Sequence, residues 1–341
     1  AMDPLTQASL GAAVAVAASS RAQARWALLI GAVAGAAPDL DVLIRSSADP
    51  LLGLEYHRHF SHALMSAPLI GLCFAVLFKW LFARSAPSFS ACARYAVLGA
   101  LTHGLLDACT SYGTLLYWPF STHRESWDLI SVIDPLFTLP LVGLTVCAFI
   151  WRHPRCAQLG LLFCALYLGF CGVQHVRASQ AAEQLATARG HQPERYSIRP
   201  SFGNSLLWRM IYRFEGRYYV DAMWAFPGAE PRLYPGRAVA QFEPSDAAAL
   251  VTADSVLGRD IERFRFFSQG YVSVHPSDDQ VLGDVRYAMW PDSVVPLWGI
   301  RINPAHPDAH IEWVTYRDAS QAARDRLWQM IQGRPVAPLG D

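Results

Sequence analysis

The segment from Leu101 to Thr114, LTHGLLDACTSYGT, places a histidine and an aspartate inside an otherwise apolar predicted helix. His103 and Asp107 are four residues apart, so at helical spacing their side chains lie on one face, one turn apart. A buried imidazole and a buried carboxylate are costly unless they are paired, and in this arrangement both could reach one metal ion. The chain must therefore fold so that further polar partners come to this helix face.

The charge distribution divides the chain into two parts. Of the 341 residues, 52% are hydrophobic and the mean hydropathy is +0.18, which is too apolar for an average soluble protein. Residues 1–177 carry 11 Lys and Arg with 9 Asp and Glu, whereas residues 178–341 carry 17 and 19. The sequence therefore predicts a helical membrane domain over residues 1–177 and a soluble extracytoplasmic domain over residues 178–341.

Six apolar or small-residue segments in the first part are predicted to be helices. Several approach the length of about 20 residues that spans a bilayer, so the expected fold is a multi-pass α-helical membrane domain of about five to six helices. The segments are Leu5–Ala18, Trp26–Ala37, Ala63–Ala83, the helix of His103 and Asp107, Asp134–Trp151 and Leu159–Val173.

Short alternating or aromatic segments, separated by Gly and Pro, follow residue 200 and predict strands. The capped amphipathic segment Asp318–Gln332 predicts a C-terminal helix. The second domain is therefore expected to be α+β and mostly β. The predicted strands are Arg217–Ala225, Arg263–Val274, Val281–Trp290, Leu297–Ile302 and Ile311–Arg317.

The basic residues predict how the first domain is oriented. Most arginines of this domain and its single lysine fall in alternate connections, which the positive-inside tendency places in the cytoplasm. The other connections, together with the second domain, then lie on the outer side of the membrane. Because only one of the 28 basic residues is a lysine and the net charge is zero, no nucleic-acid partner is expected.

Three pairs of potential metal ligands gather on the predicted outer side. Asp39 and Asp41 follow an apolar segment, and in an irregular turn both side chains can reach one cavity. Histidine and carboxylate ligands without thiolates suit Zn²⁺ first, with Mn²⁺ or Fe²⁺ as alternatives. The candidate ligands are Asp39, Asp41, His57, His62, His103 and Asp107.

Two of these pairs also have a purely structural explanation. A buried pair of His103 and Asp107 could tie two helices together by a hydrogen bond, and Asp39 and Asp41 could stop and cap a helix. Structural ionisable groups are uncommon inside membranes, and the convergence of three pairs on one side favours a metal site. The other histidines considered are expected to be surface or packing residues, namely His59, His123, His153 and His175.

A set of short motifs occurs in order along the first part of the chain. The motifs are Met2-Asp3-Pro4-Leu5-Thr6-Gln7, Pro38-Asp39-Leu40-Asp41, His57-Arg58-x-x-Ser61-His62, His103-x-x-Leu106-Asp107, Thr110-Ser111-Tyr112-Gly113-Thr114 and Asp134-Pro135. The ordered set resembles the LexA-regulated, inner-membrane-associated family of metal-dependent hydrolases. The resemblance implies a bacterial inner-membrane protein with a metal site on the periplasmic side. His59 stands where the family pattern has glycine, which leaves two alternatives at that position, a different turn or an additional ligand.

The order of these residues is also similar to the zinc-dependent phospholipase C and single-strand nuclease superfamily. In that superfamily such residues surround a cluster of metals that hydrolyses phosphoesters. Here Gln7 stands where an early histidine would help, and the sequence lacks a second clear pair of the form His-x-x-x-Asp/Glu. One or two metal ions are therefore expected instead of three.

The leading hypothesis is a membrane-embedded hydrolase that cleaves a phosphoester of a lipid or lipid-linked substrate with metal-activated water. His57 is expected to act as a ligand or as general acid/base, and Arg58 and Arg124 to clamp the phosphate through parallel guanidinium donors. One alternative is a metal-dependent hydrolase of amide or other ester bonds. Another is a non-catalytic membrane protein, in which a structural metal or polar staple accompanies an outer domain that binds a partner.

Overall fold

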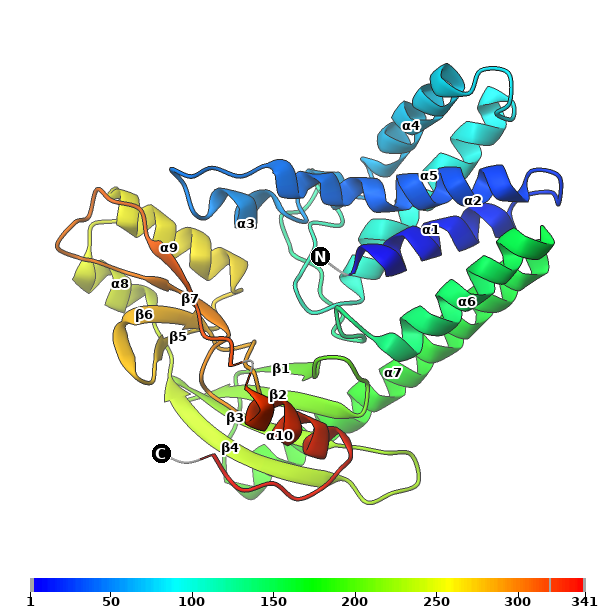
Figure 1. Cartoon of the computed structure of the whole chain (residues 1–341). Helices are drawn as coiled ribbons and strands as arrows, with labels where there is room; N and C mark the ends of the chain where they lie inside the picture. The colour runs from blue at the N-terminus through cyan, green and yellow to red at the C-terminus, as the bar shows by residue number, and fades with distance from the viewer. Residues whose placement is uncertain (1–2, 319, 340–341) are drawn as a thin grey trace. The chain divides into compact units, whose positions relative to one another are not determined.

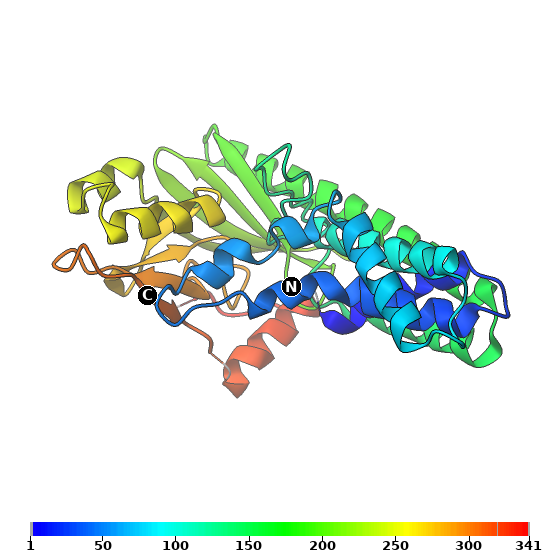
Figure 2. The same cartoon turned by 90° about the horizontal axis from the view of Figure 1, so that it is seen from above.

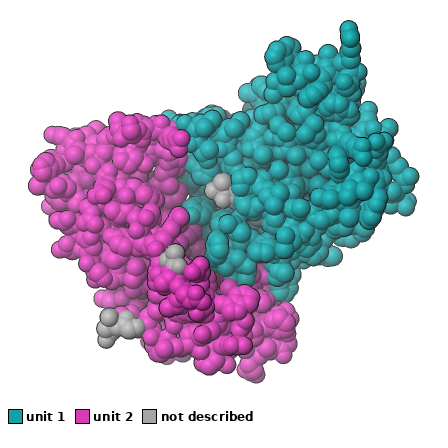
Figure 3. Space-filling model, in the orientation of Figure 1, with its two compact units in different colours: residues 1–44, 56–172, 202–204 teal, residues 45–55, 173–201, 205–341 magenta. Residues whose placement is uncertain are grey.

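The computed structural model describes residues 3–318 and 320–339, so Met2 of the first motif lies outside the described residues. Contacts divide the chain into two compact units (Figure 3). The first unit comprises residues 1–44, 56–172 and 202–204. The second comprises residues 45–55, 173–201 and 205–341, so it includes a short segment from the N-terminal part of the chain.

The first unit is helical. Three of its α-helices begin at a residue whose side chain accepts a hydrogen bond from the first turn, which satisfies otherwise free backbone donors. These caps are Asp3, Ser88 and Asp134. The helices are α1 (Pro4–Ala17), α2 (Ala24–Ala36), the 3₁₀ turns η1 (Ala37–Leu43) and η2 (Phe60–His62), α4 (Ala67–Leu81), α5 (Phe89–Ala108), α6 (Pro135–Trp151) and the first part of α7 (Pro154–Ala188).

Helices α1, α2 and α5 pack side by side (Figures 1 and 2). Their contact depends on glycine, because a Cβ atom at Gly99 of α5 would lie against the backbone of Gly31 in α2. Helix α6 packs on α7 through Phe137, whose ring centroid lies 6.0 Å from that of Tyr167. The close crossing of α2 and α5 brings the end of α2 beside the helix that carries His103 and Asp107.

The expectation of five to six membrane helices is wrong. Among the described residues, two helices are long and apolar enough to cross a membrane, or three if a bent pair counts as one span. Helices α1 and α6 have 14 and 17 residues, which at about 1.5 Å per residue is less than the roughly 30 Å hydrocarbon core. The candidate spans are Ala24–Leu43, Pro154–Ala188 and the pair Leu52–His62 with Ala67–Leu81, bent by 81°.

The second unit is rich in sheet. Two antiparallel four-stranded sheets have the orders β1-β2-β3-β4 and β5-β6-β7-β8 (Figure 1). Its other elements are most of α3 (Leu52–Tyr56), the end of α7, α8 (Pro244–Leu250), α9 (Val256–Phe267) and α10 (Gln321–Ile331). The strands are β1 (Arg195–Pro200), β2 (Leu207–Phe214), β3 (Arg217–Trp224), β4 (Arg232–Ala240), β5 (Val272–His275), β6 (Asp278–Asp284), β7 (Trp298–Arg301) and β8 (Glu312–Thr315).

Two predicted strands of this unit are wrong over most of their length. Of Val281–Trp290 only Val281–Asp284 lie in strand β6. In the segment Arg263–Val274, residues from Arg263 to Phe267 belong to helix α9, and only Val272–Val274 are in a strand. Ser255 caps the helix, and its buried residues Leu257, Ile261 and Phe264 recur every three or four positions. Leu257 and Ile261 precede Arg263. The aromatic residues after Arg263 therefore do not show the helical period by themselves, and they predict a strand.

Candidate metal centre

Three elements of the first unit bring polar side chains to one point. Turn η1, which continues α2, carries Asp39 and Asp41, and turn η2 carries His62. Helix α5 carries His103 and Asp107 on one buried face, as their spacing predicts. All of these side chains except that of Asp39 are at least 95% buried.

The local sequence explains how η2 reaches α5. Gly104 follows His103, and a Cβ atom at this position would overlap the backbone oxygen of His62. The side chain of His59 caps η2, because its Nδ1 accepts a hydrogen bond from the Phe60 amide at 2.7 Å. The residue that departs from the family pattern therefore has a structural role in this turn, and it fixes the start of the element that carries His62.

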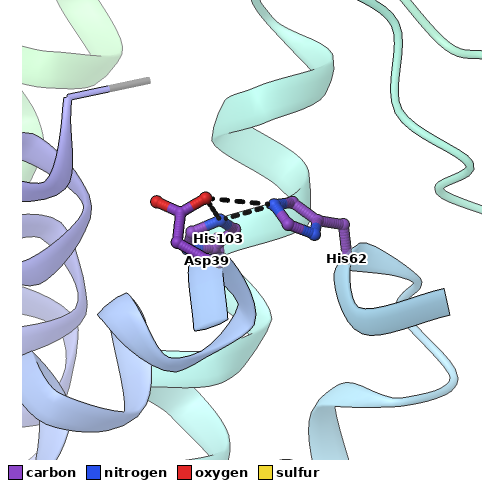
Figure 4. A group of neighbouring side chains, drawn as sticks. All are labelled: Asp39, His62 and His103. Atoms are coloured by element: carbon purple, nitrogen blue, oxygen red, sulfur yellow. Dashed lines mark hydrogen bonds and ion pairs between the residues drawn. The ribbon is translucent and has the colours of Figure 1, made fainter. Parts of the chain in front are cut away.

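The side chains of Asp39, His62 and His103 converge (Figure 4). Their Oδ1 and two Nε2 atoms are separated by 3.5, 3.5 and 2.9 Å. Oδ2 of Asp107 lies 3.3 Å from Nε2 of His62 and 3.8 Å from Nε2 of His103. Ligands at 2.0–2.1 Å around a tetrahedral Zn²⁺ stand about 3.4 Å apart. The donor types and their separations therefore fit a single metal ion.

The outward nitrogen of each histidine is already engaged. Nδ1 of His103 lies 2.6 Å from the backbone oxygen of Gly35, which can only accept a hydrogen bond. Nδ1 of His62 lies 3.2 Å from Oδ2 of Asp41. In a neutral imidazole the proton then sits on Nδ1 and the lone pair on Nε2. With both rings neutral, the two Nε2 lone pairs face each other at 2.9 Å, an arrangement that a cation between them would stabilise.

Asp41 lies outside this central group and organises its surroundings. Its Oδ1 lies 2.8 Å from Nδ1 of His57, and its Oδ2 accepts hydrogen bonds from the hydroxyl of Ser61 at 2.9 Å and from the amide of Arg58 at 3.1 Å. Asp41 therefore contacts the rings of both His57 and His62. In this it resembles the carboxylates that orient metal-bound histidines. Asp39, Asp41 and His57 also form a second group of potential ligands.

Arg58 and Asp107 form a buried ion pair next to the central group. Nε of Arg58 lies 3.0 Å from Oδ2 of Asp107, and both side chains are at most 1% exposed. Arg58 also donates to the Thr110 hydroxyl at 2.8 Å, and its backbone has a left-handed φ of 61°. The guanidinium therefore faces a carboxylate of the site, and its predicted role as a phosphate clamp would require it to leave this partner.

Gln7 is a site residue whose role the sequence did not reveal. Its Nε2 donates to Oδ1 of Asp107 at 2.9 Å and to the backbone oxygen of His103 at 3.3 Å. The amide therefore orients the carboxylate from the side opposite Arg58. The signal in the sequence is an early polar residue in the first apolar helix, but a pattern of metal ligands calls for a histidine at this position and gives glutamine no role.

The remaining polar candidates hold the loops around the site. Nη2 of Arg124 donates to the backbone oxygens of Gly113 and His57, at 2.8 and 3.4 Å. Asp134 caps α6 and accepts a hydrogen bond from the Tyr167 hydroxyl at 2.8 Å, and burial raises the pKa of this carboxyl. Neither residue belongs to the groups of potential ligands found within the described residues.

Comparison with known protein families gives a match over the first part of the chain. The model of a family described as "YdjM inner membrane protein" matches residues 2–178, which cover the whole candidate site. Neither the curated proteins nor the solved structures contain a match to the chain.

Proposed function

Because the chain belongs to the YdjM inner membrane protein family, we propose that it is an inner-membrane metal-dependent hydrolase with a phosphoester of a lipid or lipid-linked molecule as its substrate. The observation that carries this proposal is the pair of Nε2 atoms of His62 and His103, 2.9 Å apart, with both Nδ1 atoms engaged by acceptors. A divalent cation is the simplest partner for two facing lone pairs. Histidine and carboxylate ligands favour Zn²⁺, with Mn²⁺ or Fe²⁺ as alternatives.

The charges of the site support one ion instead of two. The three carboxylates and the one guanidinium in direct contact here carry a net charge of −2, namely Asp39, Asp41, Asp107 and Arg58. One divalent cation balances this charge, whereas two would leave an excess positive charge at a buried site, which is costly.

Asp39, His62 and His103 provide the three protein ligands that are typical of catalytic zinc sites. A metal held in this way lowers the pKa of water and polarises a phosphoryl oxygen. Asp39 is the most exposed of the three side chains, at 13%, so its side is where water and substrate would enter. His57 is 22% exposed and is oriented by Asp41, which suits it to move a proton between the site and solvent.

The lipid character of the substrate is supported by the membrane location and by exposed aromatic residues near the site. Phe60, two residues from His62, is 39% exposed, and Phe120 is 80% exposed. The ring of Trp118 lies 6.3 Å from that of Phe60. Tryptophan side chains favour the boundary between lipid and water, where the phosphate of a lipid also lies.

The periplasmic orientation is proposed from the ends of the helices. Basic residues follow α1, α4 and α6, for example Arg21, Arg84 and Arg152, whereas the site lies at the opposite ends, where α2 and α5 finish and α4 begins. The positive-inside tendency then places the site outside the cytoplasm. The motif resemblance to phosphoesterases supports the reaction class, and amide or other ester bonds remain the substrates to compare.

A second candidate function is a non-catalytic structural metal site with a partner-binding outer domain. It is favoured by Oδ2 of Asp107, which at 3.3 Å from Nε2 of His62 could complete a closed set of four ligands. The ion pair of this carboxylate with Arg58 competes with that role.

A substrate panel tests the proposal. The detergent-purified protein, loaded with Zn²⁺ or Mn²⁺ or treated with a chelator, is given phospholipids, lipid-linked phosphoesters, a soluble aryl phosphate and aryl ester and amide substrates. We expect metal-dependent release of phosphate or a phosphorylated head group, with the lipid substrates preferred. Stoichiometric metal without hydrolysis of any substrate would favour the structural site, and cleavage of only the ester or amide would reassign the reaction.

A further inference from the structure

The segment between Asp41 and His57 has both of its ends at the candidate site. The two side chains meet, with 2.8 Å between Oδ1 of Asp41 and Nδ1 of His57, while residues 45–55 between them belong to the second unit (Figure 3). An unrestrained segment of this length would lose conformational entropy whenever its ends were held together. Anything that fixes its middle therefore favours the contact at its ends.

Arg263 of helix α9 holds the middle of this segment. Its guanidinium binds Asp49 with two parallel hydrogen bonds, from Nη1 to Oδ1 at 3.0 Å and from Nη2 to Oδ2 at 2.9 Å. Nε and Nη2 also donate to Oε2 of Glu55, at 3.0 and 2.7 Å. Glu55 lies only two residues before His57. The guanidinium thus restrains the segment at two points, one of them next to the site residue.

Asp260 fixes the guanidinium from the other side. This carboxylate is 1% exposed and accepts a hydrogen bond from Nη1 of Arg263 at 3.0 Å. Its other oxygen lies 2.8 Å from Nδ1 of His310 and accepts a hydrogen bond from the amide of Ile311 at 3.2 Å. With Asp49, Glu55 and Asp260 as partners, the five N–H groups of Arg263 all have an acceptor.

This network differs from an ordinary surface ion pair. An isolated exposed pair contributes about 0–1 kcal/mol, and the exceptions are bidentate pairs and multi-residue networks, both of which occur here. Asp49, Asp260 and His310 also lie close enough to form a potential metal group. The guanidinium that already neutralises two of these carboxylates makes that group a poor cation site.

We infer that Arg263 is a positioning residue for the proposed reaction, which fixes the segment of residues 45–55 and through it the contact of His57 with Asp41. The inference rests on the proposed function for its effect on turnover. The structural part of the inference, that Arg263 restrains residues 45–55, does not depend on catalysis.

The test compares two arginines of the same helix in the full-length protein. Arg263→Gln removes the network, whereas Arg265→Gln removes an ion pair of Arg265 with Glu262 on the same helix. Hydrogen exchange measured by mass spectrometry is expected to be at least tenfold faster over residues 45–57 in Arg263→Gln and unchanged in Arg265→Gln. In Arg263→Gln, kcat should fall about tenfold with KM and metal content unchanged, and Arg263→Lys should recover part of the loss.

A second variant covers the case in which Arg263→Gln does not fold. Asp49→Asn/Glu55→Gln frees the segment and leaves the pair of Arg263 with Asp260 intact, and the same faster exchange is expected. Unchanged exchange in the folded variants would overturn the inference. Faster exchange in a protein whose parent form hydrolyses nothing would support the positioning role and count against the proposed function alone.

Discussion

The Asp107→Ala variant is expected to lose about 3–5 kcal/mol of unfolding free energy, the usual cost of removing one partner of a buried ion pair. Its carboxylate is fully buried and lies 3.0 Å from Nε of Arg58. Without it the guanidinium would keep the Thr110 hydroxyl and lose its only neutralising contact among the described residues. Chemical denaturation of the detergent-solubilised protein measures the loss.

A double-mutant cycle separates the ion pair from other effects of this substitution. In Arg58→Met/Asp107→Ala the buried positive charge is absent, so the double variant should lose less stability than the sum of the two single variants. Additive losses would show that the two side chains do not interact, and would contradict the buried pair.

The His103→Ala variant is expected to lose hydrolytic activity by a factor on the order of 10³ or more. Loss of an outer-shell partner typically costs 10–100-fold in metal affinity or activity, and His103 is proposed as a direct ligand. Its ring is buried, and Nε2 lies within 3.8 Å of three other candidate donor atoms. The assay uses the substrate selected from the panel, at saturating Zn²⁺ or Mn²⁺.

The control for this variant is His123→Ala, because His123 is an exposed histidine in the loop after α5. It should retain full activity. Retained activity in His103→Ala, in a protein that binds the parent amount of metal, would remove His103 from the ligand set and with it the central geometry of the site.

Local rules of sequence predicted most of the polar side chains that the structure brings together, and Gln7 is the exception. The four-residue spacing of His103 and Asp107 placed both on one face of α5, and Pro38 marked the turn that carries Asp39 and Asp41. These rules do not distinguish the residues that would bind the metal directly from those that position the ligands. That distinction depends on distances between elements, such as the approach of η2 to α5 that Gly104 permits.

The prediction of five to six membrane helices is too high because the apolar composition of a segment does not determine the length of its helix. Helix α1 is apolar but has 14 residues, and α4 forms a candidate span only together with the bent segment Leu52–His62. Small residues such as Gly31 and Gly99 pack helices together, and their apolarity therefore reflects helix contacts as much as contact with lipid. In α9 the aromatic residues by themselves predict a strand, because the helical period of buried residues begins before them, at Leu257.

Metal content is the measurement that tests the central claim most directly. Plasma mass spectrometry on detergent-purified protein should find about one divalent ion per chain, since one dication balances the charge of the site. A folded His62→Ala/His103→Ala variant should contain almost none, and His123→Ala should match the parent. A folded parent protein that binds no metal, even after reconstitution with Zn²⁺ and Mn²⁺, would contradict the account and leave the two histidines as a hydrogen-bonded pair that shares a proton.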